Sequence, residues 1–346
     1  MKDLKYLVAY SIPAAAIIGL LFRSYWVYFT PVFAFVLVPI LEILLPEDPK
    51  NLSEDDASNK SKNKFFDILL YLNLPIVYGI LGWFLYSIAW SNYSSLELAG
   101  LTFSIGIVLG SNGINVAHEL GHRTTQWEKT LGKLLLLPAL YMHFYIEHNF
   151  GHHQKAATPE DPASAKYNQS VYSFWITSII RQYKSAWKLQ KRLLTREKRS
   201  FLSVENDMLW YVVLQASYLT VVFFFFGAKA AWIAIALGVI GAILLETINY
   251  VEHYGLQRVK KQSGRYERMQ EIHSWNYNHV LGRVMLYELT RHSDHHYRAH
   301  KKYQLLDCHA SSPQMPFGYP TSMVLSLVPP LWFMVMNKRI PSEMRA

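Results

Sequence analysis

The sequence predicts an all-α membrane protein, with six transmembrane helices and a cytoplasmic, helical region rich in histidine. Three observations predict this class. Hydrophobic residues make up 51% of the 346 and charged residues 17%, where a soluble domain carries about 25%. Six apolar stretches are long enough to cross a bilayer, and most of the 14 histidines fall into tight groups. This composition excludes a disordered chain, a coiled coil and an ordinary soluble enzyme.

Each of the six apolar stretches meets the length that a bilayer demands, because a core about 30 Å thick takes roughly 20 residues of helix. The first stretch follows Lys2 and Lys5, as in a signal peptide, but it lacks a clean cleavage site of small residues. A second stretch follows at once, so we expect the first to be retained as a transmembrane helix. The six stretches are residues 6–22, 26–45, 65–90, 96–117, 208–226 and 230–250.

Two other segments need their own interpretation. Residues 131–146 form a seventh apolar run, which carries His143 and has histidine groups on both flanks. If those groups bind one metal site, both ends of the run lie on the same side of the membrane. The run is then interfacial, re-entrant or buried in protein rather than spanning. Residues 51–64 are polar without apolar periodicity, which predicts a solvated loop.

The distribution of basic residues predicts the topology. With six spans, 32 of the 34 lysines and arginines lie on one side, and only Arg23 and Lys229 lie on the other. This asymmetry places both termini and the segments 118–207 and 251–346 in the cytoplasm. The net charge of +9 then reflects a basic face against anionic lipid headgroups, and no nucleic acid partner is needed. We expect residues 1–346 to form a single membrane-embedded domain.

Four histidine groups carry the chemistry, and all of their histidines lie in the segments 118–207 and 251–346 that are predicted to be cytoplasmic. Histidines four apart share one face of a helix, and neutral imidazole is a ligand for iron, zinc and copper. Nine imidazoles are too many for one ion, but two ions would take four or five each. The single cysteine, Cys308, excludes a four-thiolate cluster. The groups are HELGH (118–122), EHNFGHH (147–153), NYVEHYG (249–255) and RHSDHH (291–296).

Two other readings of these groups are weaker. His118, Glu119 and His122 also fit the HExxH motif of zinc proteases, but an intramembrane protease would leave seven of the nine histidines without a role. A metal transporter should carry ionisable residues throughout its spans, whereas here nearly all of them lie on one side.

The motifs together resemble the integral-membrane alkane 1-monooxygenase (alkane hydroxylase) family. HELGH, EHNFGHHxxxATPEDPAS, NYVEHYG and RHSDHH match in order and spacing, as do HSWN (273–276) and PFGYP (316–320). Fatty-acid desaturases, membrane fatty-acid hydroxylases and xylene monooxygenases share the broader histidine-box plan. The spacing of the second box and the EHYG motif favour alkane hydroxylase. The departures are Arg123 for a common lysine, Thr290 for a usual glutamine, and residues 297–300.

The resemblance implies nine metal ligands. These are His118, His122, His148, His152, His153, His253, His292, His295 and His296.

Carboxylates near the boxes are expected to accept N–H bonds from the ligand imidazoles. Glu246 lies inside the sixth span, where a buried carboxylate is usually functional. The candidates are Glu119, Glu147, Asp161, Glu246, Glu252 and Asp294.

The five other histidines receive different predictions. His143 is expected to be packed or to lie behind the ligands. His273 and His279 flank the sequence SWNYN and are expected to orient ligands, whereas His300 and His309 are expected at the surface.

The resemblance also implies an activity. Two non-haem iron ions would use O2 to hydroxylate the terminal C–H bond of a medium-chain n-alkane, giving a 1-alkanol. The chain has no dinucleotide fingerprint, no haem-attachment motif and no cysteine set, so it predicts no flavin, haem or iron–sulfur group of its own. The family implies rubredoxin as electron donor, reduced by an NADH-dependent reductase, and a place in the bacterial cytoplasmic (inner) membrane. The alternative is a related desaturase, or an aryl-methyl or fatty-acid hydroxylase.

Overall fold

The structure is a computed structural model that describes residues 2–345 and is nearly all helical. Within this range the β structure is limited to three isolated bridges, Glu47↔His279, Lys260↔Tyr266 and Asn276↔Gln314. The α-helices are α1 (Ser11–Phe22), α2 (Phe29–Val32), α3 (Val38–Leu44), α4 (Glu54–Lys62), α5 (Phe65–Tyr71), α6 (Asn73–Trp90), α7 (Ser95–Val108), α8 (Asn115–Gly121), α9 (Gln126–Leu136), α10 (Phe144–Glu147), α11 (His153–Lys155), α12 (Val171–Arg196), α13 (Asp207–His253), α14 (Val280–Met285), α15 (His292–Tyr297), α16 (Tyr319–Ser326) and α17 (Pro329–Met336).

Shorter helical turns connect these helices. The π-helical turns are η3 (Phe33–Leu37), η4 (Leu109–Ile114) and η5 (His148–His152). The 3-10 turns are η1 (Lys2–Tyr10), η2 (Ser24–Tyr28), η6 (Glu271–His273), η7 (Tyr303–Leu305), η8 (Asn337–Arg339) and η9 (Ser342–Met344).

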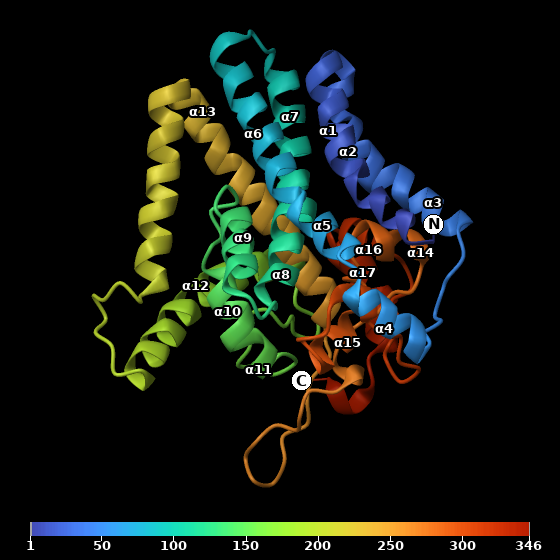
Figure 1. The fold of residues 1–346 in the computed structure, drawn as a ribbon. Coiled ribbons are helices and arrows are strands. Elements are labelled where there is room, and N and C mark those ends of the chain that lie inside the picture. The colour runs from blue at the N-terminus through green and yellow to red at the C-terminus, as the bar shows by residue number, and fades with distance from the viewer. Residues whose placement is uncertain (1, 346) are drawn as a thin grey trace. The chain divides into compact units, whose positions relative to one another are not determined.

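Among residues 2–345, five helical stretches are long and apolar enough to cross a membrane, and they cover all six predicted runs except for Leu45 at the end of the second run. The last is α13, whose 47 residues hold the fifth and the sixth run together. At Gly227 the backbone takes φ 86°, which glycine adopts without strain, and α13 folds back on itself there (Figure 1). The number of membrane crossings therefore stays a prediction. The stretches are Asp3–Phe22, Ser24–Leu44, Phe65–Trp90, Ser95–Gly121 and Asp207–His253.

The seventh apolar run is not a continuous helix. It comprises the end of α9, a turn in which Leu140 has φ 53°, and the start of α10. The polar connector differs from the predicted loop, because residues 54–62 form α4. Ser53 caps this helix by accepting the Asp56 N–H at 3.2 Å, and acidic residues in its first turn with lysines in its last complement the helix dipole. Apolar periodicity could not reveal a helix that is held by its ends.

The chain divides into two compact units. The first unit comprises Met1–Leu37, Lys64–Ile146 and Ala186–Leu245, and the second comprises Val38–Asn63, Glu147–Ser185 and Glu246–Ala346. The single-domain prediction is not tested by this division.

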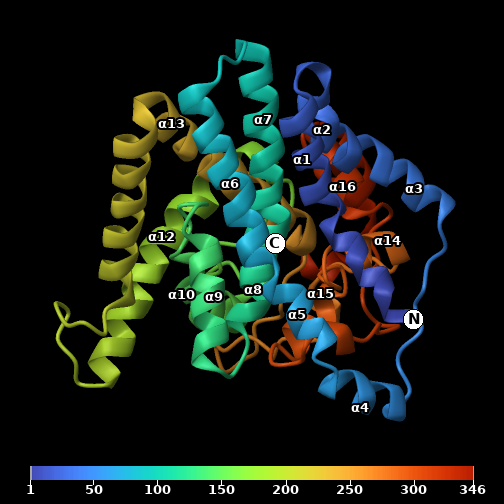
Figure 2. The same ribbon diagram turned by 45° about the horizontal axis from the view of Figure 1, so that its top comes forward.

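Close helix approach organises the first unit, in which α6 and α7 lie side by side (Figure 2). Helix α7 meets α13 at Gly106, where a Cβ would lie 2.4 Å from Ile240 Cγ2. Such glycines let helix backbones approach in an apolar surrounding, where packing rather than water exclusion holds helices together. Polar side chains also join helices there, since Asn112 Nδ2 donates to Asn73 Oδ1 at 2.8 Å.

An aromatic core organises the second unit. Trp275 and Trp332 are buried among tyrosines, and Trp275 Nε1 donates to the Tyr254 carbonyl at 2.9 Å. Tyr254 Oη in turn donates to Asn337 Oδ1 at 2.8 Å. These contacts hold the C-terminal end of α13 against the segments that precede and follow α15. The third and fourth histidine motifs, NYVEHYG and RHSDHH, are therefore anchored on one buried aromatic core.

Candidate metal centre

Four buried histidines of the second unit converge from three segments. His152 ends η5, His253 ends α13, and His292 and His296 lie on α15. Their ligand nitrogens all lie within 4.8 Å of one another. The Nε2 atoms of His152 and His296 are 3.2 Å apart, and those of His253 and His292 are also 3.2 Å apart. We call these four residues the four-histidine group.

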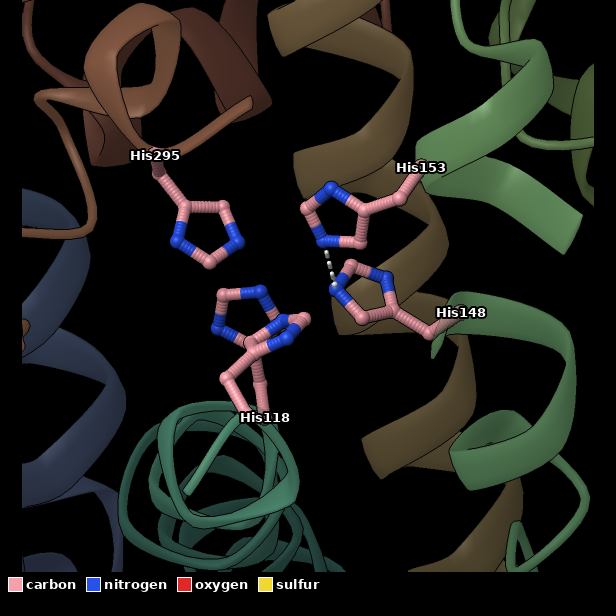
Figure 3. Close-up of side chains that lie close together, drawn as sticks. His118, His148, His153 and His295 are labelled. Carbon is pink, nitrogen blue, oxygen red and sulfur yellow. Dashed lines mark hydrogen bonds between the residues drawn. The ribbon is translucent and has the colours of Figure 1, made fainter. Parts of the chain in front are cut away.

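Three further histidines of the second unit form a separate set, the three-histidine group. His148, His153 and His295 turn their imidazoles toward one another (Figure 3). Their ligand nitrogens lie within 4.8 Å of one another, and the Nε2 atoms of His148 and His153 are 2.9 Å apart.

A π-helical turn decides how the histidines of the second box, EHNFGHH (147–153), are divided between the two groups. The His153 N–H reaches back to the His148 carbonyl, five residues earlier, which is the π-helical pattern. His148 and His153 therefore lie together, whereas His152 belongs to the other group. Residues four apart would share a face on a regular α-helix. On the short α15 that rule does hold, since His292 and His296 lie together and His295 joins the three-histidine group.

The first box lies in the first unit, at the end of α8. His118 is buried and His122 is the C-terminal capping residue of the helix. Their ring centroids are 5.1 Å apart, as expected for neighbours one turn apart. The predicted i, i+4 relation is therefore present within this helix.

The nitrogen separations fit metal binding. Two nitrogens bound to one ion at about 2.1 Å lie about 3.0 Å apart at a right angle, and about 3.4 Å apart at the tetrahedral angle. The separations of 2.9 and 3.2 Å lie close to this range. A donor set made only of imidazoles suits iron, zinc or copper. Within the described residues 2–345, Cys308 is a member of neither histidine group. Its backbone N–H donates to Asn51 Oδ1 at 2.7 Å.

Asp161 contacts His152 at the ring nitrogen that faces away from the four-histidine group. His152 Nδ1 lies 2.9 Å from Asp161 Oδ2, which also accepts from Ser164 Oγ at 2.6 Å. Burial would raise the pKa of Asp161, but the charge and hydrogen bonds of His152 and Ser164 outweigh it and lower that pKa. With Nδ1 occupied by the carboxylate, Nε2 of His152 is the nitrogen available to a metal.

Glu252 contacts the four-histidine group on the side where its Nε2 atoms meet. Its Oε2 lies 3.2 Å from His292 Nε2, the nitrogen on the inner side of the group. Its Oε1 accepts from Tyr319 Oη at 2.8 Å. Tyr319 was not singled out from the sequence, although it lies within the PFGYP motif.

The other carboxylate candidates have different partners. Glu119 Oε1 lies 3.1 Å from Arg123 Nη2. Glu147 is fully buried. This burial is the main cause, and the nearby charge of Asp161 the second, that raises the pKa of Glu147 to about 8. Glu246 accepts from Ser178 Oγ at 2.5 Å and from Gln182 Nε2 at 2.8 Å.

Asp294 lies inside the fourth box but bonds away from the ligand candidates. It accepts from Lys301 Nζ at 2.7 Å and from the Asp307 N–H at 2.8 Å, and it contacts His309 Nε2 at 2.7 Å. His309, expected at the surface, is thus partly buried against this carboxylate, whereas His300 is exposed.

The remaining histidines are held by neighbours. His273 Nε2 lies 3.1 Å from Glu267 Oε1, and its Nδ1 accepts the Gln270 N–H at 3.0 Å. His279 Nε2 lies 3.1 Å from a Glu47 oxygen. In the first unit, His143 is buried with its ring 4.3 Å from that of Tyr141.

Apolar helices and clustered imidazoles together define a multi-pass helical membrane protein with a histidine-rich metal centre. Comparison with known proteins places it further. The family model described as "Fatty acid desaturase" matches residues 94–323. Alkane 1-monooxygenase 2 of Alcanivorax borkumensis is 36% identical, over 98% of this chain and 91% of its own. Alkane 1-monooxygenase 2 of Pseudomonas aeruginosa is 38% identical, over 91% and 84%. The xylene/toluene monooxygenase hydroxylase component XylM of Pseudomonas putida is 28% identical, over 98% and 89%. The chain belongs to the alkane 1-monooxygenase family.

Proposed function

We propose that this chain is a di-iron monooxygenase that converts medium-chain n-alkanes to 1-alkanols. The observation that carries the proposal is the convergence of seven histidines of the second unit into two groups with metal-like nitrogen separations. The names of the similar proteins, alkane 1-monooxygenases, support the substrate class.

Nine histidines are proposed as ligands. His152, His253, His292 and His296 would hold one iron, and His148, His153 and His295 would hold the other. His118 and His122 would complete the nine ligands. When bound, the two irons would supply O2 reduction and oxidation of the C–H bond. The reaction takes O2, two electrons and two protons, replaces one C–H bond by C–OH, and releases the second oxygen atom as water.

The chain's own residues would orient the ligands. Asp161 accepts the Nδ1–H of His152, which fixes the tautomer and leaves the Nε2 lone pair toward the metal. Glu252 would present its second oxygen to the same group, because Tyr319 holds the first. In a zinc protease the glutamate of HExxH takes a proton from water. Here Glu119 is engaged by Arg123, which argues against that role.

Electrons would come from rubredoxin, reduced by an NADH-dependent reductase. A surface pocket of about 300 Å³ in the second unit supports docking of an acidic carrier. It is lined by Lys155, Arg258 and Arg265 against one carboxylate, Glu160. Arg258 Nη2 donates to the Gln154 carbonyl at 2.9 Å, directly after the second box. Complementary charge steers such encounters and weakens with salt.

A charge reversal tests this docking surface. Arg265→Glu should raise the KM for rubredoxin several-fold at low salt and leave kcat nearly unchanged. Lys229→Glu is the matched control, because the six-span topology places it on the opposite side of the membrane. Equal KM values for both variants would remove the pocket from the docking surface.

The proposed topology has six crossings, with the turn at Gly227 separating the last two. Both termini and the metal centre would lie on the cytoplasmic side of the inner membrane, and the alkane would enter from the lipid bilayer. Reporter fusions after Ser58 and Ser200 should read cytoplasmic, and a fusion at Ala228 should read external. An external reading at Ser200 would overturn this topology.

The xylene/toluene relative favours a second candidate, hydroxylation of an aryl methyl group. Product analysis separates the two. Purified chain with rubredoxin, reductase, NADH and ¹⁸O2 should contain about two irons and convert octane to labelled 1-octanol. Benzylic alcohol from xylene without octanol would support the second candidate. An olefin product would instead indicate a desaturase, which the family model also includes.

A further inference from the structure

Arg123 directly follows the first histidine box and is almost completely buried. Its side chain is 5% exposed. Nη1 lies 2.9 Å from Asp67 Oδ1, and Nη2 lies 3.1 Å from Glu119 Oε1. One guanidinium is therefore shared by two carboxylates that lie far apart in the sequence, as the forked donor geometry of arginine allows.

The two carboxylates belong to different helices of the first unit. Asp67 lies on α5, whereas Glu119 lies on α8 between His118 and His122. A second link lies beside this one, because Tyr71 Oη of α5 donates to Glu128 Oε1 of α9 at 2.8 Å. The polar ends of α5, α8 and α9 are thus joined around Arg123.

The backbone alone holds this end of α8 only weakly. His122 is the capping residue, and its N–H reaches the Glu119 carbonyl at 3.2 Å. The Arg123 N–H reaches the Leu120 carbonyl, also at 3.2 Å. The last four carbonyls of a helix have no N–H partner within the helix, so its last turn tends to fray. A side-chain link at this point therefore restrains the imidazole of His122 as well as the helix.

Charge makes the link sensitive to substitution. The cation of Arg123 faces three carboxylates, those of Asp67, Glu119 and Glu128. Removing one partner of a buried ion pair leaves an uncompensated charge, which costs far more than the pair contributes. Glu119 would then lose this restraint, and α8 would lose its connection to α5. Lysine could keep the charge but could not reach both carboxylates with a planar fork.

We propose that Arg123 is a positioning residue for the first histidine box. By holding Glu119 against Asp67, it fixes the rotation of α8 and with it the directions of the His118 and His122 imidazoles. This inference rests on the proposed function, because it assumes that both histidines bind a metal. Arg123 itself is not one of the possible metal ligands.

Cobalt binding tests the inference without any alkane turnover. The metal-free full chain in detergent is titrated with Co²⁺, whose absorption spectrum reports the ligand set, and its thermal midpoint is measured. Arg123→Gln should weaken one class of Co²⁺ site about ten- to hundredfold, the usual effect of removing an outer-shell partner. Arg123→Lys should recover part of this loss. Asp67→Asn, which leaves Arg123 and Glu119 in place, should lie between wild type and Arg123→Gln.

Lys133→Gln is the matched control. Lys133 Nζ lies 2.6 Å from Asp207 Oδ2, so this pair also joins two helices of the first unit, α9 and α13, but it is remote from a histidine box in the sequence. It should lower the thermal midpoint without changing Co²⁺ affinity. If Arg123→Gln binds Co²⁺ like wild type, or loses it only in proportion to a lower thermal midpoint, the positioning role is refuted. If the wild-type chain binds no Co²⁺ and no iron, the proposed function itself fails.

Discussion

Replacing Asp161 by asparagine should weaken metal binding at the four-histidine group. The substitution keeps the volume but removes the charge that His152 Nδ1 meets at 2.9 Å. Asp161 accepts from three donors, since Ser164 Oγ lies 2.6 Å from Oδ2 and the Ala163 N–H lies 3.3 Å from Oδ1. An asparagine has one acceptor oxygen and must leave at least one of these donors unsatisfied.

The magnitude follows from the kind of hydrogen bond that is lost. A bond to a charged group contributes about 1.5–3 kcal/mol, and a neutral one about 0.5–1.5 kcal/mol. The difference of about 1–1.5 kcal/mol corresponds to roughly a tenfold loss of metal affinity, since each 1.4 kcal/mol is about tenfold. This agrees with the lower end of the effect that outer-shell partners have in known metal sites, about 10–100-fold.

Asp294→Asn is the control for this prediction. Asp294 is also a buried aspartate close to a histidine box, but it bonds Lys301 and the Asp307 N–H rather than a member of either group. Competition of the purified chain with a chelator for Fe²⁺ or Co²⁺ measures both variants. Asp161→Asn should lose about tenfold in affinity, and Asp294→Asn less than about threefold. Wild-type affinity in Asp161→Asn, or equal losses in the two variants, would refute this assignment of the carboxylates.

Three further predictions follow from the same structure. Cys308→Ser should keep iron and activity, because no sulfur lies in either histidine group; iron analysis that shows a loss would overturn the all-imidazole donor set. His292→Ala should abolish octane hydroxylation while the chain stays membrane-inserted, as carbonate extraction and turnover assays would show. Gly227→Ala should lower stability by about 1–2 kcal/mol, because φ 86° is unfavourable for a residue with a Cβ. Gly82→Ala, at a helical position with open space, should not lower it in a thermal denaturation assay.

Local patterns in the sequence were sufficient for the helices that are apolar throughout. Runs such as 65–90 and 96–117 reappear within a few residues as Phe65–Trp90 and Ser95–Gly121. The two C-terminal runs appear as the two helical arms of α13, because the backbone leaves the helical conformation at Gly227, where φ is 86° and ψ is 172°. Helix α4 escaped prediction, since its capping serine and charged ends leave no apolar stripe to detect.

The histidine boxes show where local patterns stop. The spacing predicts that His118 and His122 share one face, and α8 places them one turn apart. The same rule joins His148 to His152, but the π-turn joins His148 to His153 instead. A π-turn depends on packing around the segment, so the five residues His148–His152 alone do not predict it.

The sequence by itself determined the apolar stretches, the abundance of imidazoles in short motifs and the family, because these depend on residue type and short spacing. Only the tertiary structure decided how seven histidines divide between two groups, that Asp161 rather than Asp294 meets an imidazole of these groups, and that Arg123 joins α8 to α5. Each of these pairs residues from separate segments. Such pairings are set by which segments pack together and which buried charges must find a partner, and sequence spacing carries no record of either.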